Sequence, residues 1–237
     1  MFEAFGFDLI GVTWLFLCWT GYTVYSENSR FAETNLIGSI GQRRVIWMTQ
    51  MLGRDNRMVD IQIINSLMDV VRFLASTSIL IIAGLLALLG ATDQAILVIM
   101  DLPFAAPGGR GVWEAKILLL ILIFVYAFFK FMWSMRQYTY CSVMVGAAPP
   151  PSNPMEDQEM AAHSIARVTT LASRHSNHGT RAYYFGLATL SWFVHPLLLI
   201  PSALWVVLVL HRREFRSRTL EHIRRSQGDD APGDGSK

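Results

Sequence analysis

Charged residues are scarce in this sequence. Lysine, arginine, aspartate and glutamate make up 16% of its 237 residues, whereas soluble domains average about 25%. Two cysteines are too few for a disulfide framework, and nothing in their placement suggests a metal held by thiolates. A net charge of only +2 gives no reason to expect a nucleic-acid partner. These shortages argue against a separate soluble enzyme domain, a disulfide-stabilised domain and a nucleic-acid-binding domain.

Recognisable catalytic motifs are also missing. The sequence has no glycine-rich phosphate-binding loop, no His-Glu-x-x-His motif, no nucleophile elbow and no paired-carboxylate motif. It has no visible internal repeat of the kind that builds many transporters. We therefore expect neither an enzyme activity nor a cofactor.

Long apolar runs are what the sequence does contain. They cover residues 9–25, 73–90, 117–129 and 183–210, and the third continues to Trp133. Three of the four reach the ~17 residues that a helix needs to cross a bilayer. A backbone in hydrocarbon must satisfy its own hydrogen bonds, and without a barrel pattern it does so as a helix. The sequence predicts an all-α, polytopic membrane protein with about four transmembrane helices and cytoplasmic interfacial helices.

The boundaries of this domain follow from the same runs. One membrane domain is expected over residues 1–225, and residues 226–237 are expected to be disordered because they lack core-forming side chains. The transmembrane spans are expected at residues 7–25, 72–91, 116–134 and 184–210.

Arginines outside the runs indicate the orientation of the chain. The connections at 26–71 and 135–183 are rich in arginine, whereas the connection between the second and third runs has only Arg110 and Lys116. The positive-inside rule places the two arginine-rich loops in the cytoplasm and the N-terminus outside. We expect the protein to lie in a bacterial inner (plasma) membrane.

The C-terminal segment conflicts with this orientation. Six arginines follow the fourth run, and four simple spans would export them. A re-entrant hairpin at His195-Pro196 would return them to the cytoplasm, because a proline inside a helix removes a hydrogen bond and kinks or breaks it. Each half of such a hairpin would be short for a full crossing. The sequence therefore favours one tilted, kinked span over 184–210, with the hairpin as the alternative.

Segments outside the runs show helical periodicity. Residues 42–52 have the pattern of an amphipathic helix at the cytoplasmic membrane surface. A long helix is expected over 57–90, with a polar stripe that includes Asn65, Asp69 and Arg72. A further helix is expected to start after Asn153 and to end near Gly179.

Three histidines are candidates for chemistry. His175 and His178 are three residues apart and can face one metal ion, but zinc needs three or four ligands and no carboxylate or cysteine lies near them in the sequence. Solvated histidines at a membrane surface are the simpler interpretation. His195 lies inside an apolar run, where ionisable groups often have a function, although a hydrogen-bonded packing histidine is the simpler interpretation here too.

Several short segments together resemble a known protein family. The residues that carry the resemblance are 41–44, Trp47, Met48, Asp55, 62–68, 75–79, Gly84, Lys116, 127–129, Arg136, 179–185, Trp192 and Pro196. The set resembles an integral membrane family that is catalogued as domain-of-unknown-function family 599. The resemblance covers residues 10–210 and implies about four spans, but it supplies no activity and no catalytic residues.

The resemblance also suggests a site, because its motifs fall at one face of the expected membrane domain. If those segments meet in space, they form a polar pocket at the cytoplasmic surface from Asn65, Asp69, Arg72, Arg136, Arg181 and Tyr184.

The expected function is that of a non-enzymatic membrane component, either an accessory subunit or a scaffold that binds lipid or a partner protein. Membrane lipids are the expected partners, together with a second copy of the chain or another membrane protein. The alternative is a small transporter or channel that works as a homo-oligomer. Polar residues inside the apolar runs are sparse, which argues against that alternative.

Overall fold

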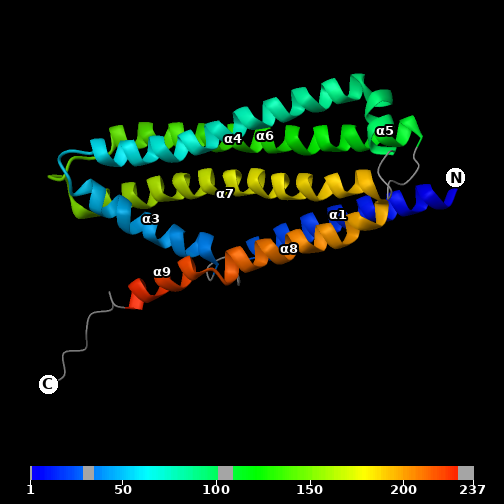
Figure 1. The fold of residues 1–237 in the computed structure, drawn as a ribbon. Coiled ribbons are helices and arrows are strands. Elements are labelled where there is room, and N and C mark those ends of the chain that lie inside the picture. The colour runs from blue at the N-terminus through cyan, green and yellow to red at the C-terminus, as the bar shows by residue number, and fades with distance from the viewer. Residues whose placement is uncertain (1, 29–34, 101–108, 229–237) are drawn as a thin grey trace.

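The computed structural model describes residues 2–28, 35–100 and 109–228, and every regular element in these ranges is a helix, which confirms the all-α prediction (Figure 1). The predicted disordered tail begins within the last helix, and its residues 229–237 lie outside the described ranges. The elements are α1 (Phe2–Glu27), α3 (Leu36–Leu52), α4 (Met58–Gly90), α5 (Thr92–Met100), α6 (Arg110–Ala147), α7 (Met155–Val194), the 3-10 turn η1 (Pro196–Leu198), α8 (Leu199–Phe215) and α9 (Arg218–Gly228).

Four segments are long and apolar enough to cross a membrane, as the sequence predicts. They are Gly6–Glu27, Met58–Gly90, Arg110–Ala147 and Pro196–Ile223. Large apolar side chains such as Leu80, Leu122 and Trp205 are exposed on their surfaces. Such exposure suits a surface that faces lipid.

Helix α7 lies between two groups of helices. In Figure 1, α4 and α6 lie on one side of it, and α1, α3 and α8 lie on the other. Apolar and small side chains along its whole length are buried against these neighbours, from Ala162 and Ile165 to Phe185 and Trp192. The core of the protein therefore forms around α7.

The chain reverses direction at His195-Pro196, and the predicted single span over 184–210 is not present. Helix α7 ends at Val194, and His195 has an extended backbone with φ −155° and ψ 135°. The Nδ1 atom of His195 accepts a hydrogen bond from the N–H of Leu197 at 3.2 Å, which supports the turn. Helix α8 then runs back along α7 (Figure 1).

Contacts with α1 confirm the direction of α8. A Cβ atom on Gly11 would lie 3.3 Å from a methyl carbon of Leu199, so the start of α1 meets the start of α8. The hydroxyl of Tyr22 donates a hydrogen bond to Glu214, so the end of α1 meets the end of α8. Helices α1 and α8 are therefore parallel, and both run antiparallel to α7. The physical reason for the difference from the sequence prediction is that Pro196 ends a helix here and does not merely kink it.

Three of the helices are much longer than a bilayer is thick. Helices α4, α6 and α7 have 33, 38 and 40 residues, which at 1.5 Å per residue is roughly 50–60 Å, against about 30 Å of hydrocarbon. Each of these helices is therefore longer than a single crossing requires, and α3 covers one end of the three-helix layer (Figure 1).

Helix α3 differs from the amphipathic surface helix that the sequence predicts. It begins earlier, at Leu36, and its side chains Met48, Met51 and Leu52 are fully buried against the protein. Its apolar face therefore packs on the other helices, with α7 as its main neighbour.

The predicted helix end near Gly179 is wrong, because α7 continues through Gly179 to Val194. A Cβ atom at this position would lie 2.6 Å from Cε1 of Phe131, which is fully buried on α6. Gly179 therefore allows the close approach of α6 to α7 and does not end the helix.

Candidate functional site

A buried ion pair joins three helices at the point where α1 ends. The guanidinium of Arg181, 2% exposed, donates from Nη2 to both carboxylate oxygens of Glu214 at 3.0 and 3.1 Å. The hydroxyl of Tyr22 donates to the same carboxylate at 2.8 Å, and the Arg181 guanidinium lies 5.3 Å from the centre of the Tyr22 ring. A bidentate, hydrogen-bonded pair of this kind fixes its partners in one geometry. It connects α7 to α1 and α8.

The last residue of α1 extends this ion pair. The Nε2 atom of His178 lies 2.6 Å from an Oε1 atom of Glu27, and Nη1 of Arg181 lies 3.6 Å from the same oxygen. The Nη1 atom is buried and makes no hydrogen bond within the part of the chain that the structure describes. Arg181 therefore keeps one unused donor on the side of Glu27.

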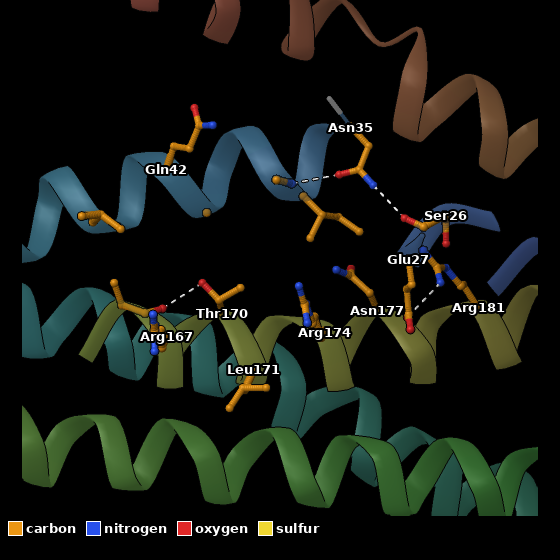
Figure 2. Close-up of a pocket in the computed structure, with 15 residues that line it drawn as sticks. Ser26, Glu27, Asn35, Gln42, Arg167, Thr170, Leu171, Arg174, Asn177 and Arg181 are labelled. Atoms are coloured by element: carbon orange, nitrogen blue, oxygen red, sulfur yellow. Dashed lines mark hydrogen bonds and ion pairs between the residues drawn. The ribbon is translucent and has the colours of Figure 1, made fainter. Parts of the chain in front are cut away.

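A cavity of about 670 Å³ begins at this point and lies between α3 and α7 (Figure 2). Arginines at seven-residue intervals on α7, Arg167, Arg174 and Arg181, contribute to its lining. The other lining residues are Ser26, Glu27, Asn35, Ile37, Gly38, Gly41, Gln42, Val45, Ala166, Thr170, Leu171 and Asn177. A seven-residue interval is two helical turns, so the three arginines follow one side of α7.

The wall of the cavity on α3 is built from small residues and a helix cap. Asn35, 2% exposed, accepts a hydrogen bond from the N–H of Gly38 at 2.9 Å and donates to the carbonyl of Ser26 at 3.1 Å (Figure 2). This cap ties the start of α3 to the end of α1. A Cβ atom on Gly41 would meet only the hydroxyl of Thr170, at 4.0 Å. Gly41 therefore leaves open space here.

The electrostatics of the cavity favour an anion. Its lining holds three guanidinium groups and one carboxylate, Glu27, which His178 and Arg181 already engage. Arg167 and Arg174 are exposed, and neither makes a hydrogen bond or a close ion pair among the described residues, although the charge of Arg174 acts on Glu27. Guanidinium groups match phosphate and carboxylate groups in shape and charge. The cavity can therefore hold an anionic group against α7.

Two arginines of the first loop, Arg54 and Arg57, have structural partners instead. Arg54 donates to the fully buried carboxylate of Asp60 at 2.9 Å, and the indole N–H of Trp47 donates to the same carboxylate at 2.7 Å. Arg57 donates to carbonyl oxygens at the end of α6, among them that of Ala148 at 3.0 Å. These two arginines hold the turn between α3 and α4 and the end of α6.

The polar residues that the sequence places in one pocket lie in two groups. Asp69 and Arg72 pair with each other on the exposed surface of α4, and Asn65 lies on the same helix. Arg136 is exposed on α6, with its guanidinium carbon 5.9 Å from the ring of Trp133.

Arg181 and Tyr184 form the second group, and both meet α8. Arg213 donates to the hydroxyl of Tyr184 at 3.0 Å. Helices α4 and α6 lie on the other side of α7 from α8 (Figure 1), and within the described ranges no hydrogen bond or ion pair joins the two groups.

Each of the candidate histidines has a different partner. His178 pairs with Glu27, whereas His175 has its ring centre 6.5 Å from that of Trp133. Burial, with the neighbouring charge of Lys130 and the neighbouring His178, lowers the pKa of His175 below its usual range. No group of three metal-ligating side chains occurs within residues 2–28, 35–100 and 109–228. His195 supports the turn between α7 and α8 through its contact with Leu197.

Sequence reasoning missed most partners of Arg181. Tyr22, Glu27 and Glu214 are far from it in the chain, and no local pattern connects them. The seven-residue spacing of Arg167 and Arg174 relative to Arg181 was the one available signal for the cavity.

No curated protein and no solved structure matches this chain. A family model does match it, over residues 10–219, and that range includes α3, α7 and α8 with the ion pair between Arg181 and Glu214. The chain belongs to the DUF599 family of proteins of unknown function.

Proposed function

We propose that this membrane protein binds an anionic group, a phosphate or carboxylate of its ligand, in the cavity between α3 and α7. The observation that carries the proposal is the row of Arg167, Arg174 and Arg181 along a cavity with a single, already engaged carboxylate. The side chains of Asn177 and Thr170 add an amide and a hydroxyl to the same lining. These groups suit binding and orientation of a ligand, in a protein without enzyme activity.

The orientation of the protein supports this location for the site. We place five passes through the membrane, formed by α1, α4, α6, the second half of α7, and α8. The reversal at His195-Pro196 then puts the arginines of α8 and α9 on the same side as the loops at 26–71 and 135–183. With the N-terminus outside, the two loops and the C-terminal arginines all lie in the cytoplasm, as the positive-inside rule requires. The cavity opens at the cytoplasmic surface of what we propose is a bacterial inner membrane.

Helix α7 is a suitable fifth pass although it is less apolar than the others. Its second half is covered by its neighbours, and Ala182, Phe185, Gly186 and Thr189 are buried. Because these side chains face protein and not lipid, the helix does not need a continuous apolar surface.

Substitution of a cavity arginine tests the proposed function. Binding is measured for glycerol 3-phosphate by calorimetry and for dioleoyl phosphatidylglycerol by native mass spectrometry, on purified protein in detergent. Arg174→Gln is expected to weaken binding of at least one of them about tenfold or more, because it removes a charged hydrogen-bond donor. Arg72→Gln is the matched control, since Arg72 is exposed and lies outside the cavity.

The outcomes separate the two sources of the anionic group. Weakened binding of glycerol 3-phosphate identifies a site for soluble anions as well as headgroups, whereas weakened binding of the lipid alone identifies a lipid site. Equal affinities in Arg174→Gln, Arg72→Gln and the unaltered protein for both probes would contradict the proposal. The expected alternative of an oligomeric transporter or channel stays a prediction, to be tested by flux through reconstituted vesicles.

A further inference from the structure

A second cavity lies between α1 and α6, within the apolar stretch of both helices. It has a volume of about 370 Å³, which is in the range of small-ligand sites. Helix α1 packs mainly on α8 and α7, whereas α6 packs on α7 and α4, and this leaves a groove between α1 and α6. The groove is lined by Phe16, Trp19, Thr20, Thr23, Val24, Leu119, Leu122, Ile123 and Tyr126.

Aromatic stacking forms the base of this groove. The ring of Trp19 stacks on that of Phe185 of α7, with centroids 5.5 Å apart and planes at 13°. The ring of Tyr126 meets Trp19 edge to face at 5.4 Å. These contacts hold Trp19 in place. The groove is therefore shaped by fixed side chains.

The hydroxyl groups of the groove, on Thr20, Thr23 and Tyr126, lie from its middle toward the end of α1, where Val24 is also part of the lining. The groove residues nearest the start of α1 are apolar, with Phe16 on α1 and Leu119 on α6. Thr23 and Tyr126 lie toward the end of α1, and the hydroxyl of Thr23 is buried without a hydrogen-bond partner among the described residues. From Phe16 to Val24 the groove follows α1 for roughly 12 Å at 1.5 Å per residue. This is the polarity profile of an acyl chain that ends in a polar headgroup.

A cation, the ammonium of Lys130, lies near the polar end of the groove. The ammonium of Lys130 lies 5.2 Å from the centre of the Tyr126 ring. Glu27 is one helical turn beyond Thr23, and it both lines the arginine cavity and pairs with His178 and Arg181. The groove, at Thr23, and the arginine cavity, at Glu27, are therefore one helical turn apart on α1.

We propose that the ligand is an anionic membrane lipid, with its headgroup in the arginine cavity between α3 and α7 and one acyl chain in the groove between α1 and α6. This inference rests on the proposed function, because it assigns the anionic group of that site to a lipid. Charge complementarity selects an anionic lipid over a zwitterionic one. The apolar groove then selects a lipid over a soluble phosphate.

Filling the groove tests the inference separately from the headgroup site. Leu122→Trp adds a bulky ring at the mouth of the groove, on a side chain that is 64% exposed. Leu118→Trp is the matched control, because Leu118 lies on the same helix one turn earlier, is also exposed and does not line the groove. Both variants should fold, since both positions face outward, and a thermal melt in detergent checks this.

Binding is measured by native mass spectrometry with dioleoyl phosphatidylglycerol, dioleoyl phosphatidylcholine and glycerol 3-phosphate as probes. Leu122→Trp is expected to lower the affinity for phosphatidylglycerol about tenfold, or about 1.4 kcal/mol, and to leave any affinity for glycerol 3-phosphate unchanged. Leu118→Trp is expected to change neither. Phosphatidylcholine is expected to bind more weakly than phosphatidylglycerol to all three proteins.

Three results would overturn the inference. If Arg174→Gln weakens phosphatidylglycerol binding and Leu122→Trp does not, the headgroup site stands and the acyl-chain groove is wrong. If Leu122→Trp weakens binding and Arg174→Gln does not, the proposed anion site fails and the groove binds chains without regard to charge. If the two lipids bind equally, or Leu118→Trp acts like Leu122→Trp, neither site selects an anionic lipid.

Discussion

Two cations are buried at opposite ends of the pair formed by α1 and α8, and their surroundings differ. Lys116, 4% exposed, donates a hydrogen bond to the carbonyl of Trp192 at 2.8 Å and is surrounded by the rings of Trp113, Trp192 and Phe193. Arg181, at the other end, binds the carboxylate of Glu214 and keeps one nitrogen toward a cavity. Lys116 satisfies a carbonyl group at the end of α7, whereas Arg181 keeps a hydrogen-bond donor that a ligand can use.

The partner of Lys116 explains its role. The carbonyl of Trp192 would accept a hydrogen bond from residue 196 in a continuous helix, but that residue is Pro196, which has no N–H. Lys116 supplies the missing donor, and its charge lies at the C-terminal end of α7, where the helix dipole favours a cation. The indole N–H of Trp192 is used by Asp8 at 2.7 Å. The end that holds Lys116 is therefore a structural closure, and the comparison predicts that only the end that holds Arg181 affects ligand binding.

The largest effect on stability is expected from Glu214→Ala. This change leaves the guanidinium of Arg181 buried without its carboxylate, which costs about 3–5 kcal/mol. The free energy of unfolding, measured by denaturant titration in mixed micelles, should fall by that amount. Asp69→Ala is the control, because its ion pair with Arg72 is exposed and is worth less than about 1 kcal/mol. Equal losses in the two variants would show that Arg181 does not depend on Glu214.

Two glycine substitutions compare the stability cost of an added methyl group at a packed position and at the cavity wall. Gly179→Ala places a Cβ atom 2.6 Å from the buried ring of Phe131, and such overpacking costs about 1–3 kcal/mol. Gly41→Ala adds a Cβ atom with only a hydroxyl 4.0 Å away, so stability should be unchanged or slightly higher, by up to about 1 kcal/mol. Thermal melting in one detergent ranks the two. A lower Tm for Gly41→Ala than for Gly179→Ala would mean that the cavity closes in solution.

Lys116→Met tests the closure beside Trp192 directly. Methionine keeps the apolar length of the side chain but leaves the carbonyl of Trp192 without a donor, which costs about 1–2 kcal/mol. Binding of phosphatidylglycerol should stay within twofold of the unaltered protein, about 0.4 kcal/mol. Measuring both properties on the same preparation separates the roles of the two ends. Lost binding at unchanged stability would reverse the assignment.

The sequence predicted the helices well because their signal is local. Apolar runs and helix-start residues predicted where α1, α4 and α6 lie, and these match the long apolar helices of the structure. The reversal at His195-Pro196 was harder to predict, since a proline inside an apolar run can either kink or end a helix. What decides between the two is the contact of α8 with α1, at Gly11 and Leu199, which are 188 positions apart. Local pattern carries no information about such a contact.

The candidate site divides in the same way. Arg181 is predictable as a site residue because it belongs to a distinctive run of residues, 179–185. Its partners Tyr22 and Glu214 come from helices at the two ends of the chain, and only packing brings them together. Asp69 and Arg72 were expected beside Arg181. That expectation assumed four spans and no return of the chain at α8. In the structure α8 does return, and α4 and α8 lie on opposite sides of α7 (Figure 1).

The smallest expected effect is a pH dependence that comes from His175. Burial, with Lys130 and His178 nearby, lowers the pKa of this imidazole in the folded protein. The unfolded chain therefore takes up a proton at a higher pH than the folded protein does, and stability falls as the pH drops below about 6.5.

His175→Gln removes this proton uptake, so its Tm should decline less between pH 7 and pH 5 than that of the unaltered protein. His163→Gln is the control, because His163 is exposed on the same helix. An identical decline in all three proteins would place the acid-sensitive group elsewhere, with the ion pair of His178 and Glu27 as the next position to substitute.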